Sequence, residues 1–323
     1  MARGVRPLSA EQPAAPADDG QGRPSEPRRP SAASRLGGFV LALRPRQWPK
    51  NALVFAAPIA AGDATNAHIM GLACAAFVAF CMAASGTYLV NDIRDVESDR
   101  LHPVKRNRPI AAGLVPVGPA YVLAVVLVVG ALVIAFLTSR DFGITLFAYL
   151  ALTTCYTLWL KRMPILDIIA VAAGFVLRAI GGATSTGLPI SEWFFIVTSF
   201  GALLVVVGKR ESELHSLGER AGEVRPILAV YTPEFLRYLR AVATGVVLVA
   251  YCLWAFDSAA RSADGAVWFQ ISIVPFTAAI FQYGLVLERG GGEHPEVVLT
   301  TDRAILVSAA VWAVIYAVAV YRT

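Results

Sequence analysis

The chain has 323 residues, of which 56% are hydrophobic and only 16% are charged, and its formal net charge is +5. Soluble domains carry roughly 25% charged residues, so this composition excludes an ordinary soluble domain. Because the apolar residues form long runs, the sequence predicts an all-α, polytopic membrane protein embedded in a lipid bilayer. The positive charge is concentrated on one side of the predicted membrane, and we expect no nucleic-acid partner.

Residues 1–33 are rich in proline, alanine and arginine and contain almost no large apolar side chains. Such a segment cannot bury enough apolar surface to offset the entropy lost on ordering. We therefore expect a disordered cytoplasmic tail over residues 1–33 and one transmembrane domain over residues 34–323. A tail attracted to anionic lipid and a tail without a function of its own both fit this composition.

Nine apolar segments follow the tail. The first is interrupted by residues 44–50 (RPRQWPK), whose prolines and cations do not fit in hydrocarbon. We expect this segment to begin as an interfacial helix and to enter the membrane after Pro49. The nine segments lie near residues 36–61, 67–90, 117–137, 142–160, 165–184, 192–208, 236–256, 267–287 and 303–321.

Lysine and arginine are distributed unevenly between the loops. They lie mainly before residue 51 and after the second, fourth, sixth and eighth segments, whereas the other loops hold only Arg140 and Arg261. Cytoplasmic loops are enriched in these residues, so the N-terminus and the basic loops are expected in the cytoplasm. An odd number of spans then places the C-terminus outside the inner (plasma) membrane. The sequence leaves a homo-oligomer open.

The densest cluster of charge follows the second segment, in residues 91–108 (NDIRDVESDRLHPVKRNR). On a helix, Asn91, Asp92, Asp95 and Asp99 share an arc of roughly 100°. Carboxylates on one face repel each other unless a cation lies between them, and Mg²⁺ binds such oxygens together with substrate phosphates. Three cations follow these acidic residues in the sequence, namely Lys105, Arg106 and Arg108. They could hold phosphate oxygens that the metal ion does not reach. The alternative is a solvated, mixed-charge loop between two helices.

Residues 91–99 resemble the NDxxDxxxD motif of the UbiA superfamily of intramembrane prenyltransferases. Residues 44–51 (RPRQWPKN) are similar to its decaprenyl-phosphate phosphoribosyltransferase branch, and the resemblance covers about residues 36–321. It implies a nine-transmembrane-helix, UbiA-like bundle with an active site that faces the cytoplasm. It also implies Mg²⁺ bound by Asp92, Asp95 and Asp99.

A second cluster, residues 156–167 (YTLWLKRMPILD), lies between the fourth and fifth segments. Asp167 and Arg178 lie within about 20° on one helix face, which also carries Gly174. An arginine inside a membrane segment needs a cavity or a partner, and glycine beside it makes room for a ligand or a close helix crossing. The alternative is that Lys161 and its neighbour Arg162 only anchor the loop at the cytoplasmic side. The pattern from these cations to Arg178 is again similar to the phosphoribosyltransferase branch.

A third cluster, residues 208–214 (GKRESEL), ends the sixth segment. Prenyl-diphosphate enzymes of the UbiA superfamily usually carry a second Asp-rich motif here, whereas this chain has Lys209 and Arg210. Fewer acidic ligands indicate fewer metal ions, and the added cations indicate phosphate held directly by the protein. The alternative is a helix-end cluster that pairs with itself. Tyr231 and Thr232 in the following loop are near enough in sequence to reach the site.

The resemblance supplies the expected reaction. It is the Mg²⁺-dependent transfer of 5-phosphoribosyl from 5-phospho-α-D-ribosyl 1-diphosphate to decaprenyl phosphate, which yields decaprenylphosphoryl-5-phosphoribose, a precursor of cell-wall arabinan in actinobacteria. The residues expected to be catalytic are Asn91, Asp92, Asp95, Lys209 and Arg210. The residues expected to bind substrate are Lys50, Asn51, Asp99, Arg106, Arg108, Tyr156, Lys161, Asp167, Arg178 and Glu211. Two alternatives are a UbiA-type enzyme that prenylates an aromatic acceptor and a carrier of organic anions.

Overall fold

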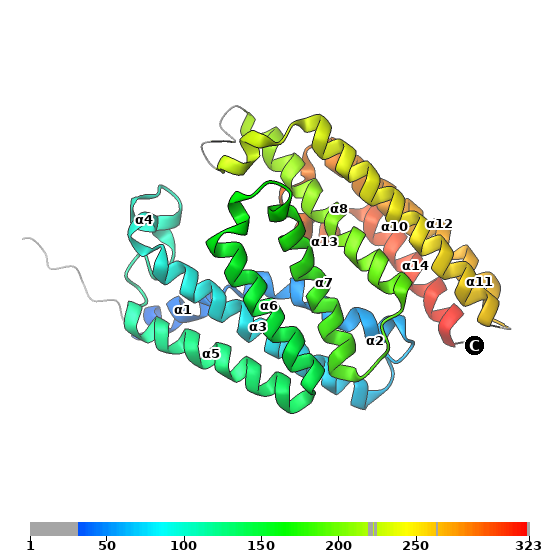
Figure 1. The fold of residues 1–323 in the computed structure, drawn as a ribbon, viewed down its shortest axis with the longest axis horizontal. Coiled ribbons are helices and arrows are strands. Elements are labelled where there is room, and N and C mark those ends of the chain that lie inside the picture. Colours follow the sequence, from blue (N-terminus) through cyan, green and yellow to red (C-terminus); the bar gives the residue numbers. More distant parts are fainter. Residues whose placement is uncertain (1–31, 219–221, 223–224, 263, 322–323) are drawn as a thin grey trace, which may run out of the picture.

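The computed structural model describes residues 32–218, 222, 225–262 and 264–321 (Figure 1). The tail predicted over residues 1–33 lies almost wholly outside the described residues. Within the described ranges the chain forms helices and no strand, as the composition predicts. The α-helices are α1 (Ala32–Ala42), α2 (Ala56–Ala60), α3 (Ala67–Arg94), α4 (Val96–Leu101), α5 (Val117–Thr138), α6 (Arg140–Leu158), α7 (Leu166–Thr186), α8 (Glu192–Leu217), α10 (Pro233–Arg261), α11 (Ala266–Ile271), α12 (Ile273–Glu288), α13 (Pro295–Thr301) and α14 (Arg303–Tyr321). The 3₁₀ helices are η1 (Pro45–Phe55), η2 (Lys105–Asn107), η3 (Leu160–Arg162), η5 (Pro226–Val230) and η6 (Gly291–Glu293).

In the described part of the chain, 8 helical stretches are long and apolar enough to cross a membrane. They are α3, α5, α6, α7, α8, α10, α11 together with α12, and α14. They coincide with the second to ninth apolar segments, so the prediction of a multi-pass membrane protein is confirmed. The first predicted segment differs, because it is divided into α1, η1 and α2. Pro45 and Pro49 remove backbone donors there, and a 3₁₀ helix takes the place of a continuous α-helix.

The divided first segment docks on α3 and α7. The indole of Trp48 donates to Ser85 Oγ at 3.1 Å, and Ser85 donates to the carbonyl of Leu43 at 2.8 Å. On the other side, a Cβ at Gly182 of α7 would overlap the backbone of Val54 in η1. This glycine lets the end of η1 lie directly against α7, and the contact fixes the position of η1 there.

The long helices pack as neighbouring pairs. In Figure 1, α3 runs beside α5 on one side of the molecule, and α10, α12 and α14 lie together on the other. Between α3, α6 and η1, Phe80, Phe142 and Leu146 form a core that is closed to solvent. The outward faces carry exposed apolar side chains such as Val126 and Val133 of α5, as expected where lipid surrounds a helix.

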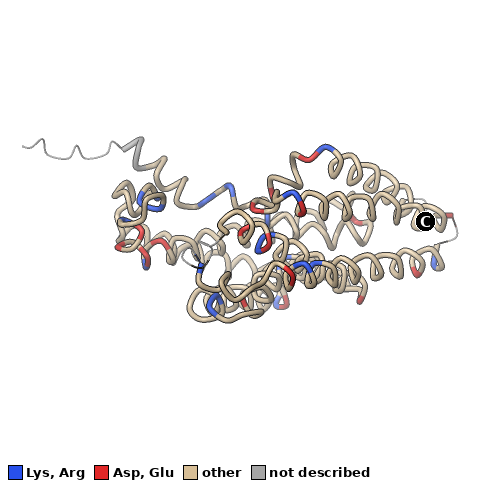
Figure 2. The backbone as a smooth tube through the Cα atoms, turned by 90° about the horizontal axis from the view of Figure 1, so that it is seen from above, with Lys and Arg blue, Asp and Glu red and all other residues tan. Residues whose placement is uncertain are grey.

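Charged residues gather at the ends of the long helices and in the connections between them, whereas most of each helix carries none (Figure 2). Connections that are far apart in the sequence meet at one side of the bundle. Arg225, before η5, contacts Tyr156 at the end of α6, and Tyr231 contacts Asp167 at the start of α7. The second predicted cluster therefore lies against the connection that follows the third.

Candidate active site

The acidic motif lies at the end of α3. Asp92 Oδ1 accepts hydrogen bonds from Arg44 Nη2 at 2.6 Å and from Arg108 Nη1 at 3.1 Å. The same Arg108 nitrogen donates to Asp99 Oδ2 at 2.6 Å. Asp92 and Asp99 are only 3% and 2% exposed, so one guanidinium nitrogen bridges two buried carboxylates. Arg44 has a left-handed backbone, with φ of 55°, and stacks over the ring of Tyr88 at 4.8 Å.

Asp95 is separated from its two neighbours in the motif. It caps the C-terminal end of α3, where φ is −93° and ψ is 7°, and its side chain is exposed. The chain then starts a new helix at Val96. Because the motif does not follow one helix, its carboxylates do not line one face as the sequence predicted. Among the residues that the structure describes, no three His, Cys, Asp or Glu side chains form a group able to hold a metal ion.

A first cavity of about 240 Å³ opens beside this motif, between η1, α3, α6 and α7. Asn91 lines it from the motif side, Lys50 from η1 and Arg178 from α7. The remaining lining is made of small, apolar and hydroxyl side chains, among them Gly174 and Thr153. The cavity therefore offers two cations and an amide in a largely apolar wall, an arrangement that suits an anionic group.

Arg178 is 9% exposed and is held from three directions. Its Nε donates to Asn51 Oδ1 at 2.7 Å, its Nη1 to the carbonyl of Gly174 at 2.6 Å, and its Nη2 to the hydroxyl of Tyr149 at 2.8 Å. Its guanidinium also lies over the rings of Tyr149 and Phe175, at 4.7 and 5.6 Å. These neutral partners orient the guanidinium but leave its charge available to an anion.

A second cavity of about 190 Å³ adjoins the first. The two cavities share Lys50, Tyr156, Val171 and Phe175. The second is also lined by cations, namely Lys209 and Arg210 of α8 and Arg225 from the following connection. Four of its ten lining residues are thus cationic, a composition that favours phosphate.

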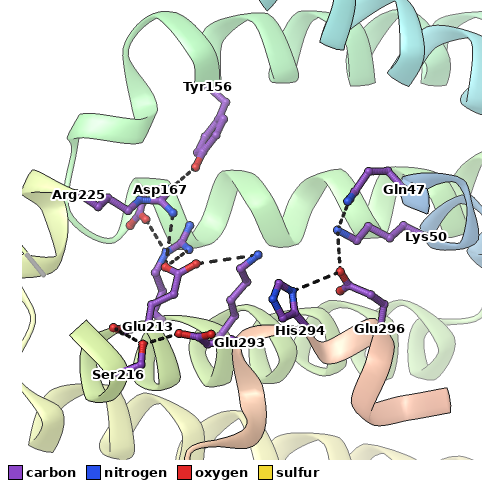
Figure 3. A network of polar contacts seen from close by, with 12 residues as sticks. Gln47, Lys50, Tyr156, Asp167, Glu213, Ser216, Arg225, Glu293, His294 and Glu296 are labelled. Carbon is purple, nitrogen blue, oxygen red and sulfur yellow. Dashed lines mark hydrogen bonds and ion pairs between the residues drawn. The ribbon is translucent and has the colours of Figure 1, made fainter. Parts of the chain in front are cut away.

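Carboxylates stand behind these cations (Figure 3). Arg210 Nε donates to Asp167 Oδ2 at 3.0 Å, and the two side chains are 3% and 0% exposed. Glu213 Oε2 accepts from Arg210 Nη1 at 2.9 Å and lies 3.6 Å from Arg225 Nη1, while its Oε1 lies 3.9 Å from Lys209 Nζ. Neither Asp167 nor Glu213 is among the residues that line the second cavity. The cations therefore line the cavity, and the carboxylates form ion pairs with them from outside the cavity lining.

Tyr231 completes the support of Asp167. Its hydroxyl donates to Asp167 Oδ1 at 2.5 Å and accepts the backbone N–H of Ile165 at 2.7 Å. Ile165 has a φ of 67°, which is costly for a β-branched residue, and this hydrogen bond stabilises the turn that starts α7. Burial and the hydrogen bond to Asp167 raise the pKa of Tyr231 to about 12, so the hydroxyl remains a donor at neutral pH.

Residues 52–301 match the UbiA prenyltransferase family, and this match spans most of the chain. The chain belongs to this family. A UbiA homolog from Archaeoglobus fulgidus bound to DMAPP and Mg²⁺ has the same fold, with a TM-score of 0.65 at 17% identity. The alignment covers 88% of this chain and 100% of that one.

Several relatives that are 40% or more identical to this chain carry the name decaprenyl-phosphate phosphoribosyltransferase. The protein of Corynebacterium glutamicum is 44% identical over 289 residues, which cover 88% of this chain and 87% of the relative. The protein of Mycobacterium tuberculosis is 41% identical over 285 residues, which cover 87% of this chain and 93% of the relative.

This UbiA-family structure places the predicted site residues in three groups. The residues that line a cavity are Lys50, Asn91, Tyr156, Arg178, Lys209 and Arg210. The residues that lie behind them or in the carboxylate pair are Asn51, Asp92, Asp99, Arg108 and Asp167. The predicted residues outside both groups are Asp95, Arg106, Lys161 and Glu211.

Glu211 shows most clearly why a predicted residue lies elsewhere. Its Oε2 is 3.0 Å from Nε of Arg240 on α10, so its side chain leaves α8 on a different face from the cavity. Glu213, two residues later, is the acid that reaches the cavity cations. Glu213 lies in the third predicted cluster, but it was not predicted as a site residue, and neither were Arg225 and Tyr149. Helical spacing from Arg210 was a signal for Glu213, whereas nothing in the sequence joined Tyr149 to Arg178.

The residues of the acidic motif fit a divalent cation. Asp92 and Asp99 already converge on one positively charged nitrogen of Arg108. Oxygen ligands from one or two carboxylates, completed by substrate phosphates, are what Mg²⁺ takes in such sites. Asp92 and Asp99 are therefore the residues that would hold such a cation, together with the phosphates of a substrate.

Proposed function

We propose that this chain transfers the 5-phosphoribosyl group of 5-phospho-α-D-ribosyl 1-diphosphate to decaprenyl phosphate. The observation that carries the proposal is the pair of adjoining cavities, which share Lys50 and present Arg178 on one side and Lys209, Arg210 and Arg225 on the other. A donor with three phosphoryl groups and an acceptor with one bring more negative charge than a prenyl diphosphate and an aromatic ring. The names of the two relatives support the same reaction.

In this proposal, a phosphate oxygen of the acceptor attacks the anomeric carbon of the donor. The new bond joins that oxygen to the carbon, the bond from the carbon to the diphosphate oxygen breaks, and the diphosphate leaves with the electron pair. The acceptor phosphate is already anionic at neutral pH, so no base has to remove a proton. Positioning and charge stabilisation by the protein then supply most of the rate enhancement.

The chain's own cations have separate roles in this reaction. Arg178 and Lys50 face the first cavity, beside the acidic motif, and would bind the diphosphate of the donor. The second cavity is lined by Lys209, Arg210 and Arg225, which would bind a phosphate group other than that diphosphate. Mg²⁺ held by Asp92 and Asp99, with Asp95 nearby in sequence, would neutralise the leaving diphosphate.

We also propose that the divided first segment is the ninth membrane crossing. The helical rises of α1, η1 and α2 sum to about 45 Å along a path that bends at Arg44, which is more than the ~30 Å of a hydrocarbon core. The uneven distribution of lysine and arginine supports a cytoplasmic N-terminus, cytoplasmic cavities and an external C-terminus. A homo-oligomer within the plasma membrane is compatible with this arrangement.

A transfer assay with the purified protein tests the proposed reaction. The protein, decaprenyl phosphate and donor labelled in the ribose are incubated with Mg²⁺, and we expect label in the lipid phase. Chelation of Mg²⁺ with EDTA should abolish the transfer, and added Mg²⁺ should restore it. A parallel reaction with labelled polyprenyl diphosphate and an aromatic acceptor tests the other UbiA chemistry. Product in that reaction alone would contradict the proposal.

A further inference from the structure

Lys50 has a special place among the cations, because it lines both cavities. Its Nζ donates to Gln47 Oε1 at 2.6 Å, and its side chain is 24% exposed. The positive charges of Lys209 and Arg178 act on it from the two sides. A flexible lysine between two other cations is repelled from both, so its position depends on a counter-ion.

Glu296 supplies that counter-ion from the far end of the chain. It lies in the first turn of α13, and its Oε1 is 3.9 Å from Lys50 Nζ and 4.0 Å from His294 Nδ1 (Figure 3). Its Oε2 is closed to solvent and has no hydrogen-bond partner among the described residues. The neighbouring Pro295 lines the second cavity, so α13 forms part of the cavity wall.

The segment that carries Glu296 is fixed to α8. The N–H of Gly292 donates to Ser212 Oγ at 3.0 Å, and a Cβ on Gly292 would overlap Leu287. Glu293 accepts a short hydrogen bond from Ser216. Because these contacts anchor η6 to α8, the backbone that carries Glu296 is held beside the cavities.

We propose that Glu296 is a positioning residue that holds the Lys50 ammonium between the two cavities, where two phosphate groups bound at the same time share it. The proposal rests on the proposed function for the identity of the two phosphates. Lys50 has three donors on one nitrogen: Gln47 takes one of them, and Glu296, at 3.9 Å, acts through its charge. Two donors therefore remain, one for a phosphate on each side. Without the carboxylate, repulsion by Lys209 and Arg178 moves the ammonium away from the shared position.

A double-mutant cycle tests the coupling between these two residues. Glu296→Gln, Lys50→Met and the double variant are purified, and transfer kinetics and the Kd of inorganic diphosphate with Mg²⁺ are measured for each. We expect Glu296→Gln to lower kcat/KM by about tenfold, as for loss of one charged contact. In the Lys50→Met background the same change should alter kcat/KM by less than about twofold. Glu296→Asp keeps the charge and should retain more activity than Glu296→Gln.

Glu293→Gln is the matched control, because it removes a carboxylate charge from the same segment, while the amide oxygen can still accept the anchoring hydrogen bond from Ser216. It should leave kcat/KM within about twofold of the wild type. Equal losses from Glu296→Gln in both backgrounds would show that the acid only docks α13 and would overturn the proposal. Failure of the wild type itself to transfer phosphoribosyl would instead refute the proposed function, and the diphosphate affinities would still decide whether Glu296 acts through Lys50.

Discussion

Replacing Arg210 by lysine keeps the positive charge and removes the planar guanidinium, so it separates a phosphate-binding arginine from a simple membrane anchor. The side chain is 3% exposed, and two of its nitrogens serve two carboxylates, Asp167 at 3.0 Å and Glu213 at 2.9 Å. A lysine has one nitrogen and cannot occupy both positions. Asp167 is fully buried, so the ammonium should remain with it and leave Glu213.

The expected cost follows from these contacts. A hydrogen bond between charged groups contributes about 1.5–3 kcal/mol. Glu213 is 19% exposed and keeps its other two cations, Lys209 and Arg225, which places the loss near the lower limit. We expect the free energy of unfolding to fall by about 2 kcal/mol. Loss of a bidentate contact to phosphate in a partly hydrated cavity should also raise the KM of the phosphoribosyl donor by roughly tenfold.

Thermal unfolding in detergent and steady-state kinetics measure the two effects separately. Arg240→Lys is the matched control, because Arg240 is a similarly buried arginine that bridges Glu211 and Glu288 outside both cavities. It should lower the unfolding temperature and leave the KM of the donor unchanged. Lys209→Ala should instead raise the KM of the donor by about three- to tenfold and cause little loss of stability. Unchanged stability and kinetics in Arg210→Lys would refute the reasoning and reduce the cluster to a positive anchor.

Three further predictions concern the rest of the chain. Asp92→Asn should fold but lose nearly all turnover, because it weakens the hold on a metal-bound diphosphate; near-normal activity would remove Asp92 from the metal site. Tyr149→Phe should lower kcat/KM by about tenfold through loss of the hydrogen bond to Arg178, and a silent substitution would show that the other partners suffice. Removal of residues 1–30 should leave activity in detergent within about twofold of the full chain, since the tail has no apolar surface to bury. A tenfold loss in the truncated protein would assign the tail a part in the site.

The membrane-spanning helices could be predicted from the sequence because each is a long apolar run with charges at its ends. Eight of the nine predicted segments form membrane-length helices, and one of these eight is divided into α11 and α12. The first could not be predicted in detail, since its path depends on contacts of Trp48 with Ser85 and of Val54 with Gly182. These contacts join residues from different helices, and no local pattern contains them.

Local periodicity explains both a success and an error within the candidate site. Val206, Lys209 and Arg210 line the second cavity, and Glu213 is seven residues after Val206, so these residues share one face of α8. Glu211 is turned by about 100° from Arg210 and faces α10 instead. The acidic motif was placed on one helix by the same rule, but α3 ends at Arg94 and the rule does not apply beyond it. Periodicity is reliable only where the helix continues.

In the proposed function, the second cavity holds phosphate with fixed cations in place of a second acidic motif. A metal ion brings its charge when the substrate binds, whereas arginine and lysine side chains are charged from the moment the chain folds. Buried cations without partners would destabilise the fold. Here Asp167, Glu213 and Glu296 stand behind Arg210, Arg225, Lys209 and Lys50, and none of the three acids is among the cavity-lining residues. The acids stabilise the unliganded cations, the four cations outnumber them, and the remaining positive charge is directed at the substrate.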